Sequence, residues 1–354
     1  MNSSNRLRLD YAKESATFEA IEGGIIDIHS HIHGNRAAEI YARAADDYGI
    51  TLTYSMTSLD EVPSVKKILG ERVRFIAIPR FHSSNPRAAF GAGFIRELPA
   101  FKAHGARIAK FWNAPRIYEA ADEPFATNPF RINSPSRIEA MHAVVDHGMI
   151  FMAHIGDPDT WFATKYRDAR RYGTKLEQYE LFSEVLERFP VPWIAAHMGG
   201  YPEDLTFLSN FLTKHPNLYL DCSATKWIVR ELSKHTSLEL RHFFSKWRGR
   251  LIFGSDIVTR ESHLSENHAA TEMDSKASNE AEAYDLYASR YWALRTLLEK
   301  PYHGESPISD PDLHLVDNKR YTPLDAPTLR GCELDSESLT ALYRQTAADT
   351  LGLG

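Results

Sequence analysis

The sequence predicts an α/β protein built as a (β/α)8 TIM barrel with a C-terminal helical and extended addition. Short apolar runs rich in Val, Ile and Phe recur along the chain, helical segments separate them, and several of these segments end at Gly or Pro. Strands that alternate with helices pair in parallel, and eight such units are typical of a closed barrel. A doubly wound open sheet is the second choice, because the first strand is not followed by a Gly-rich phosphate-binding turn.

Eight apolar runs are the predicted strands. In chain order they are GIIDIHSHI (24–32), ITLTYSM (50–56), RVRFIAIPRF (72–81), ARIAKFWN (106–113), MIFMAHIGD (149–157), VPWIAAHMGG (191–200), NLYLDCSA (217–224) and LIFGSDIV (251–258). Helical spacing is clearest in AAEIYARAADDYG (37–49), SPSRIEAMHAVVDHG (134–148), KLEQYELFSEVLERFP (175–190) and PEDLTFLSNFLTKHP (202–216). We expect a single domain over 1–354, with a barrel core over 21–260 and the last barrel helix and a C-terminal extension over 261–354.

The composition limits the classes of function. The chain has 354 residues, 43% of them hydrophobic, and a formal net charge of -6 without a basic run, which argues against a nucleic-acid partner. Its two cysteines, Cys222 and Cys332, are too few for a disulfide framework. The first twenty residues lack the apolar core of a signal peptide, and no apolar run is long enough to span a membrane. We therefore expect a cytoplasmic protein with no membrane partner.

Three histidines alternate within and directly after the first predicted strand. His29, His31 and His33 stand at every second position, so they share one face of the strand. Unpaired imidazoles on a buried face are costly, and a metal ion is the simplest compensation. We interpret the pair His29 and His31 as metal ligands, and His33 as a hydrogen-bonded structural residue just above the site.

Other polar residues interrupt the apolar runs, nearly all toward their C-terminal ends. They are Lys110 in the fourth run, His154 in the fifth, His197 in the sixth and Asp256 in the eighth. In a (β/α)8 barrel these ends form the catalytic face, so residues more than 200 positions apart are expected to converge on one pocket. Three imidazoles and a carboxylate suit Zn²⁺, and also Mn²⁺, Fe²⁺ or Co²⁺.

Each of these residues also has a simpler interpretation. Asp256 could cap the following helix. Lys110 could be a substrate clamp, a carboxylated bridge between two metal ions, or an outward-pointing side chain, and we rank a structural or clamp role first. Side chains of the loops could bind a carboxylate and an aromatic ring, or could equally be loop packing: Arg80, Trp112, Arg116, Trp161 and Phe162.

Four motifs in order resemble the amidohydrolase superfamily. DIHSH, HIGDP, HMGG and GSD are similar to its amidohydrolase-related branch, which includes aminocarboxymuconate semialdehyde decarboxylase, γ-resorcylate decarboxylase and pyrone dicarboxylate lactonase. The resemblance covers roughly residues 21–260. A weaker match lies in the tail, where ISDPDLHLV and LTALYRQTAADTLGL resemble the terminal helix of that branch.

The resemblance implies a metal ion held by His29, His31, His154 and Asp256. His197 would lie near the ion, as an acid/base or as a ligand of a second ion. Two-metal members of the superfamily carry a carboxylated lysine where Lys110 stands, whereas the amidohydrolase-related branch usually has one metal ion. We favour one divalent ion per chain over two, and Zn²⁺ is the first candidate for its identity.

This set of residues predicts a metal-dependent enzyme that acts on a small molecule. In hydrolysis of an ester, lactone or amide, Asp256 would take the proton of a metal-activated water, and His197 would stabilise the developing oxyanion. The alternative is non-oxidative decarboxylation of a hydroxylated aromatic or muconate-type acid. A non-catalytic barrel that binds a metal or metabolite is a third hypothesis, but a decayed site should have lost a ligand and this one has lost none.

The stretch from Arg260 to Arg330 has an unusual composition. A predicted helix is followed by the Pro-rich segment KPYHGESPISDPDLHLVDNKRYTPLDAPTLRG. We expect this long extended excursion to form an oligomer contact, in a possible homo-oligomer, or to cover the active site. A loose wrap over the surface is the alternative.

Overall fold

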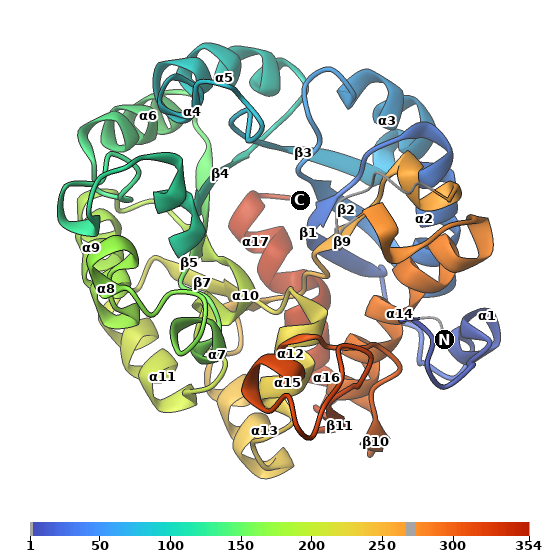
Figure 1. Cartoon of the computed structure of the whole chain (residues 1–354). Helices are drawn as coiled ribbons and strands as arrows, with labels where there is room; N and C mark the ends of the chain where they lie inside the picture. Colours follow the sequence, from blue (N-terminus) through green and yellow to red (C-terminus); the bar gives the residue numbers. More distant parts are fainter. Residues whose placement is uncertain (1–2, 267–273, 354) are drawn as a thin grey trace. The chain divides into compact units, whose positions relative to one another are not determined.

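The computed structural model describes residues 3–266 and 274–353, shown in Figure 1. The chain divides into two compact units: unit 1 consists of Met1–Arg74 and Cys222–Gly354, and unit 2 of Phe75–Asp221. The prediction of a single domain stays a prediction. In both units strands alternate with helices and pair in parallel, so the fold is α/β of the (β/α)8 barrel class, as predicted from the sequence.

Unit 1 carries both ends of the chain and the first and last barrel strands. Its barrel strands are β1 (Ile25–His31), β2 (Ile50–Ser55), β8 (Leu251–Ile252) and β9 (Ile257–Val258). Strand β1 pairs in parallel with β2 on one side and β9 on the other. The helices are α1 (Tyr11–Ser15), α2 (Asn35–Asp47), α3 (Val62–Leu69), α12 (Thr225–Leu232), α13 (Ser237–Lys246), α14 (Glu280–Glu299), α15 (Asp312–Val316), α16 (Ser336–Thr340) and α17 (Thr346–Leu351).

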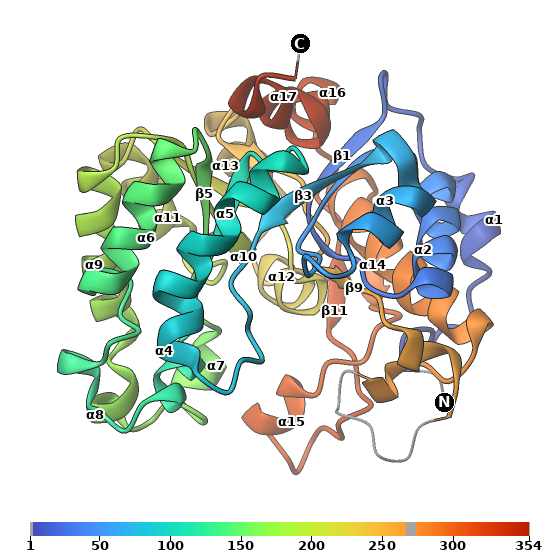
Figure 2. The same ribbon diagram turned by 90° about the horizontal axis from the view of Figure 1, so that it is seen from above.

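Unit 2 contains five strands that pair in chain order. They are β3 (Val73–Ala77, which begins at the end of unit 1), β4 (Ile108–Asn113), β5 (Ile150–Ile155), β6 (Trp193–Ala195) and β7 (Leu218–Asp221). The helices are α4 (Pro86–Ala88), α5 (Phe94–Ala103), α6 (Pro135–Asp146), α7 (Asp159–Phe162), α8 (Ala169–Tyr172), α9 (Lys175–Arg188), α10 (Ala196–Gly199) and α11 (Leu205–Lys214). In Figure 2, α6, α9 and α11 stand next to one another in this unit.

Aromatic side chains fill the interior of unit 2. Phe151 of β5 stacks on Trp193 of β6 with ring centroids 4.1 Å apart, and Phe111 of β4 lies edge-on to Phe151 at 5.6 Å. These residues come from neighbouring parallel strands, where large β-forming side chains pack well against one another. Helix α9, the last helix before β6, starts at a capping box in which Thr174 and Glu177 satisfy each other's backbone N–H groups.

All eight apolar runs contain a strand, but the last run is not one continuous strand as we predicted. It holds β8 and β9, separated by Phe253–Asp256. The strand is interrupted because Asp256 adopts a left-handed φ of 58°, which is incompatible with extended backbone. Gly254 lies so close to β1 that a Cβ atom there would be 2.9 Å from the Cβ of His29. The segment therefore turns against β1.

The C-terminal addition contains the predicted helix and the extended excursion. Helix α14 is followed by β10 (His303–Glu305), α15 and β11 (Thr328–Arg330), and β10 pairs antiparallel with β11. The excursion is tied down, because the buried Arg230 of α12 forms an ion pair with the buried Asp310 and a second one with Asp312 at 3.4 Å. The excursion is thus anchored to α12, and its use as an oligomer contact or as a cover of the active site stays a prediction. Residues 267–273 of the unusual stretch lie outside the described residues.

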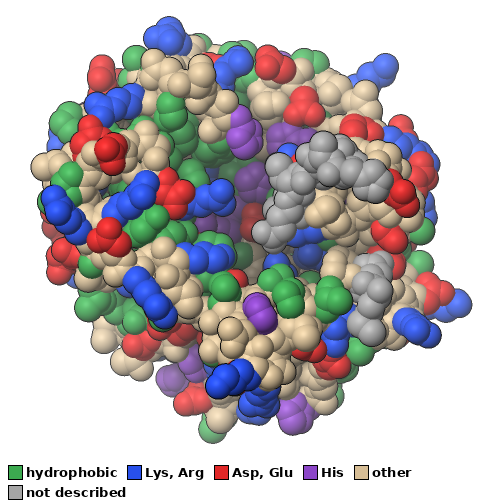
Figure 3. Space-filling model, viewed as in Figure 1, with side chains coloured by type: hydrophobic (Ala, Val, Ile, Leu, Met, Phe, Trp, Pro, Cys, Tyr) green, Lys and Arg blue, Asp and Glu red, His purple; other side chains and the backbone are tan. Residues whose placement is uncertain are grey.

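One face of the molecule carries charges of both signs. On the face in Figure 3, Lys and Arg side chains are interspersed with Asp and Glu, in keeping with the small net charge of the sequence. Among the residues that the structure describes, no helix is long and apolar enough to cross a membrane.

Candidate metal centre

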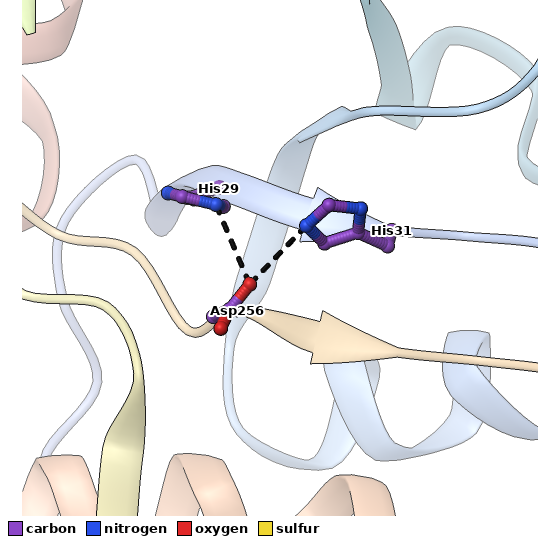
Figure 4. Close-up of side chains that lie close together, drawn as sticks. All are labelled: His29, His31 and Asp256. Carbon is purple, nitrogen blue, oxygen red and sulfur yellow. Dashed lines mark ion pairs between the residues drawn. The ribbon is translucent and has the colours of Figure 1, made fainter. Parts of the chain in front are cut away.

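His29, His31 and Asp256 meet in unit 1, as Figure 4 shows. The Oδ1 atom of Asp256 lies 3.4 Å from Nε2 of His29 and 3.2 Å from Nε2 of His31. One potential ligand atom from each residue falls within 4.8 Å of the other two. His29 is buried, whereas His31 and Asp256 are partly exposed, so one side of the group is open to solvent.

The backbone explains why these three side chains meet. His29 and His31 alternate on β1, so they leave the strand on the same side. The backbone N–H of Asp256 donates to the carbonyl of His29 at 2.8 Å, which fixes the left-handed residue beside the strand. Left-handed non-glycine residues are strained and concentrate at functional sites. Asp256 is followed by β9 (Ile257–Val258) and not by a helix, so it does not cap one.

The donor set fits a divalent metal ion. Two imidazoles and a carboxylate are ligands of Zn²⁺ in catalytic sites. A hydrogen bond of 3.0 Å joins Nδ1 of His29 to the hydroxyl of Ser223, which leaves Nε2 on the side of Asp256. Such an outer partner fixes the orientation of a ligating histidine.

Asp27, two residues before His29 on β1, is completely buried. Its carboxylate accepts hydrogen bonds from the backbone N–H groups of His29 and Ser255 and from the hydroxyls of Ser255 and Tyr291. Burial raises the pKa of Asp27 to about 6, although these donors act in the opposite direction. The network extends to Tyr41, whose hydroxyl lies 2.9 Å from that of Tyr291.

His33 forms the hydrogen bond that we predicted for a structural residue. Its Nδ1 lies 2.6 Å from Oε2 of Glu61, and the other oxygen of Glu61 accepts from the backbone N–H of Gly34 at 3.0 Å. Burial lowers the pKa of His33, and the hydrogen bond to Glu61 opposes this effect. His33 therefore secures the end of β1 to the loop before α3.

His154 and His197 are neighbours in unit 2, with ring centroids 4.6 Å apart. Nε2 of His154 donates to Oδ1 of the buried Asp157 at 3.0 Å, and the hydroxyl of Tyr166 donates to the other oxygen of Asp157 at 3.0 Å. This arrangement orients His154 and leaves its Nδ1 as the acceptor nitrogen. The roles of His154 as a metal ligand and of His197 as acid/base stay predictions.

The HMGG motif forms a left-handed turn. His197, Met198, Gly199 and Gly200 have φ values of 59°, 53°, 63° and 79°. Left-handed conformation costs a non-glycine residue roughly 1–2 kcal/mol, so two consecutive examples require strong support from their surroundings. The carboxylate of Asp221 supplies part of it, because Oδ1 accepts from the backbone N–H of His197 at 2.8 Å. This turn gives His197 its position at the end of β6.

The predicted substrate-binding residues all lie in unit 2, and their role stays a prediction. Lys110 is buried on β4. Trp112, at the end of the same strand, contacts the ring of Phe81, and the exposed Arg80 is paired with Glu97. Arg116 is exposed. The rings of Trp161 and Phe162 pack against Tyr166, the partner of Asp157, so these two residues support the loop that orients His154.

Sequence reasoning missed the residues that form hydrogen bonds with the candidate histidines. Asp27, Ser223 and Asp157 contact histidines, yet none was singled out from the sequence. Asp27 gave the clearest signal, because a carboxylate inside an apolar strand needs several donors. Ser223, the partner of His29, gave no signal in the sequence, since it comes from a segment almost 200 positions away.

The fold is a parallel α/β barrel, and its first strand carries two histidines that face a carboxylate after β8. This combination of fold and donor set is typical of metal-dependent barrel enzymes. The chain belongs to the amidohydrolase family, because the sequence model of that family matches residues 90–353. The chain is therefore a metal-dependent enzyme of the amidohydrolase class, as the sequence predicted.

Solved structures similar to this chain include three enzymes. A probable 2-pyrone-4,6-dicarboxylic acid hydrolase from Acinetobacter baumannii has 11% identity and a TM-score of 0.48. The 2,6-dihydroxybenzoate decarboxylase from Rhizobium has 12% identity and a TM-score of 0.43, and the 5-carboxyvanillate decarboxylase from Sphingomonas paucimobilis has 11% and 0.44. Each comparison covers 93% of this chain and 99% of the other. No curated protein matches the chain.

Proposed function

We propose that this protein hydrolyses a small-molecule ester, lactone or amide with the help of one divalent ion per chain, Zn²⁺ first among the candidates. The observation that carries the proposal is the group of His29, His31 and Asp256, whose ligand atoms lie within 4.8 Å of one another. His154 is the fourth ligand that we propose from the family resemblance. When bound, a divalent ion supplies an acidified water and polarises a substrate carbonyl.

The side chains of the protein would provide proton transfer, stabilisation of the oxyanion and substrate binding. Asp256 is partly exposed, so its carboxylate can accept a proton from the attacking water and return it to the leaving atom. His197 donates a hydrogen bond to the oxyanion that develops on the substrate. Lys110, Arg116 and Arg80 supply positive charge for a substrate carboxylate, and Trp112 and Trp161 supply apolar contact for a ring.

Decarboxylation of a hydroxylated aromatic or muconate-type acid is the alternative reaction, because the same ligands can hold a carboxylate. The two reactions differ in their products. We would incubate the purified protein with aromatic carboxylates, lactones and amides in water enriched in ¹⁸O. Hydrolysis places solvent oxygen in the product, and this is the expected result. Release of CO₂ without uptake of solvent oxygen would replace our proposal by the alternative.

The metal ion is tested separately from the reaction. Elemental analysis of the purified protein should give about one divalent ion per chain, and the double variant His29→Ala/His31→Ala should lose it, because both imidazoles are removed. His303→Ala, an exposed histidine on β10, is the matched control and should keep the ion. Unchanged metal content in the double variant would show that the ion binds elsewhere. Two ions per chain, with carboxylated Lys110 detected by mass spectrometry, would favour the bridged arrangement.

The remaining expectations concern the substrate class, the cellular location and the partners of the enzyme. A small-molecule substrate follows from the family. The cytoplasmic location, the homo-oligomer and the lack of a nucleic-acid partner stay predictions.

A further inference from the structure

Asp27 is a buried carboxylate that no step of the proposed reaction uses. Its side chain has no exposed surface, although it stands in an apolar strand where an aliphatic residue would pack at lower cost. Oδ1 accepts from the backbone N–H of His29 at 3.1 Å and of Ser255 at 3.0 Å. Oδ2 accepts from the hydroxyl of Ser255 at 2.6 Å and of Tyr291 at 2.8 Å. Four donors thus surround one carboxylate.

Three of these donors come from the two segments that carry the metal ligands. His29 itself is one ligand, and Ser255 immediately precedes Asp256, the carboxylate ligand. Asp27 therefore joins β1 to the turn after β8 at the point where both present their ligands. The fourth donor is the hydroxyl of Tyr291, which belongs to a third element, α14.

The turn after β8 needs such a restraint. Asp256 is left-handed, and Gly254 approaches β1 so closely that a Cβ atom would be 2.9 Å from the Cβ of His29. A strained segment keeps its conformation only when its surroundings fix it. A small shift of this turn would change the distances of 3.4 and 3.2 Å between Asp256 and the two histidines.

We propose that Asp27 is the positioning residue of the metal centre: its carboxylate sets the spacing between the histidines of β1 and Asp256. The proposal rests on the proposed function, because it requires these three residues to bind the ion. A residue needed only for folding would alter stability and leave the properties of the bound ion unchanged. A positioning residue alters the affinity and the coordination geometry of the ion.

The experiment uses the metal ion alone and needs no substrate. Zinc affinity is measured for the full chain by competition with a chromophoric chelator, and the visible absorption spectrum of the cobalt-loaded protein reports the coordination geometry. Asp27→Asn should weaken zinc binding by about 10- to 100-fold, the usual effect of losing an outer partner of metal ligands, and should change the cobalt spectrum. The amide has similar size but cannot accept from all four donors.

Tyr41→Phe is the matched control. Tyr41 belongs to the same buried network through Tyr291, but its hydroxyl forms no hydrogen bond with Asp27. The control should lose stability and keep the zinc affinity and cobalt spectrum of the unchanged protein. If Asp27→Asn does not fold, Ser255→Ala removes one donor to Asp27 and should alter the affinity and spectrum in the same direction, by less.

The outcomes separate the two proposals. Asp27→Asn and Ser255→Ala with the zinc affinity and cobalt spectrum of the unchanged protein would overturn the role of Asp27 while leaving the metal centre intact. Failure of the unchanged protein to bind zinc or cobalt would overturn the proposed function itself, and the positioning role with it.

Discussion

Asp256 combines two roles at one residue, since its carboxylate is proposed both to hold the ion and to accept the proton of the attacking water. Asp256→Asn should leave the fold and much of the metal in place, because the amide still offers an oxygen to the ion. It cannot accept the proton, so the turnover rate should fall by about 10²–10⁴-fold. Turnover is measured with a substrate from the panel above, and metal content is measured in parallel. A variant with near-normal turnover would contradict the proton-accepting role of Asp256.

The two cysteines give a residue-scale prediction outside the metal centre. Cys222 and Cys332 are both buried, and burial raises the pKa of the Cys332 thiol to about 12. Below that pH the thiol stays protonated, and only the thiolate is a good nucleophile. At pH 8 iodoacetamide should label native Cys332 on the order of 10³-fold more slowly than an exposed thiol. Peptide mass spectrometry measures the labelling, with protein unfolded in urea as the control. Rapid labelling of native Cys332 would show that the side chain is accessible.

At the scale of elements, the left-handed turn after β6 depends on Gly200. Gly200 and Gly249 both have left-handed φ values, 79° and 82°. A Cβ atom at Gly200 would be 1.9 Å from the carbonyl oxygen of Ile155, whereas one at Gly249 would meet nothing within 4 Å. Gly249→Ala should therefore cost only about 1–2 kcal/mol of stability, the penalty of the left-handed backbone. Gly200→Ala should cost roughly 3 kcal/mol or more, because a backbone atom must move.

The midpoints of urea unfolding of these two variants and of the unchanged protein test this difference. The pair is matched in substitution and in φ, so the comparison isolates the close contacts that a Cβ atom would make at Gly200. Equal midpoints for the two variants would mean that the turn after β6 relaxes without cost.

The strands could be predicted from the sequence more accurately than the turns that follow them. Apolar runs mark each barrel strand, because strand formation here depends on local hydrophobic pattern. The break between β8 and β9 was missed, since the left-handed φ of Asp256 depends on its hydrogen bond to His29, more than 200 positions away. The left-handed turn at HMGG was missed for a similar reason: it is supported by Asp221 of the next strand. Contacts of this kind leave no local pattern in a sequence.

At the scale of the whole molecule, the site could be predicted in part for topological reasons. The C-terminal ends of parallel strands meet at one edge of a sheet, so His31 and Asp256 could be brought together from strand order alone. The partners that orient the proposed ligands, such as Ser223 for His29, could not be predicted, because they depend on which way each side chain turns.

Metal binding should also stabilise the folded chain as a whole. His29 and Asp256 are more than 200 positions apart, so the unfolded chain does not present them together, and the ion binds the folded state preferentially. Free zinc at a thousand times its dissociation constant would add about 4 kcal/mol to the free energy of unfolding. The thermal midpoint should fall after treatment with a chelator, recover with zinc, and rise with zinc concentration. In His29→Ala/His31→Ala the midpoint should not respond to zinc, whereas Gly249→Ala, destabilised at the turn before β8, should keep the full response. A wild-type midpoint that is the same with chelator and with zinc would mean that the ion does not bind the folded protein in preference to the unfolded chain.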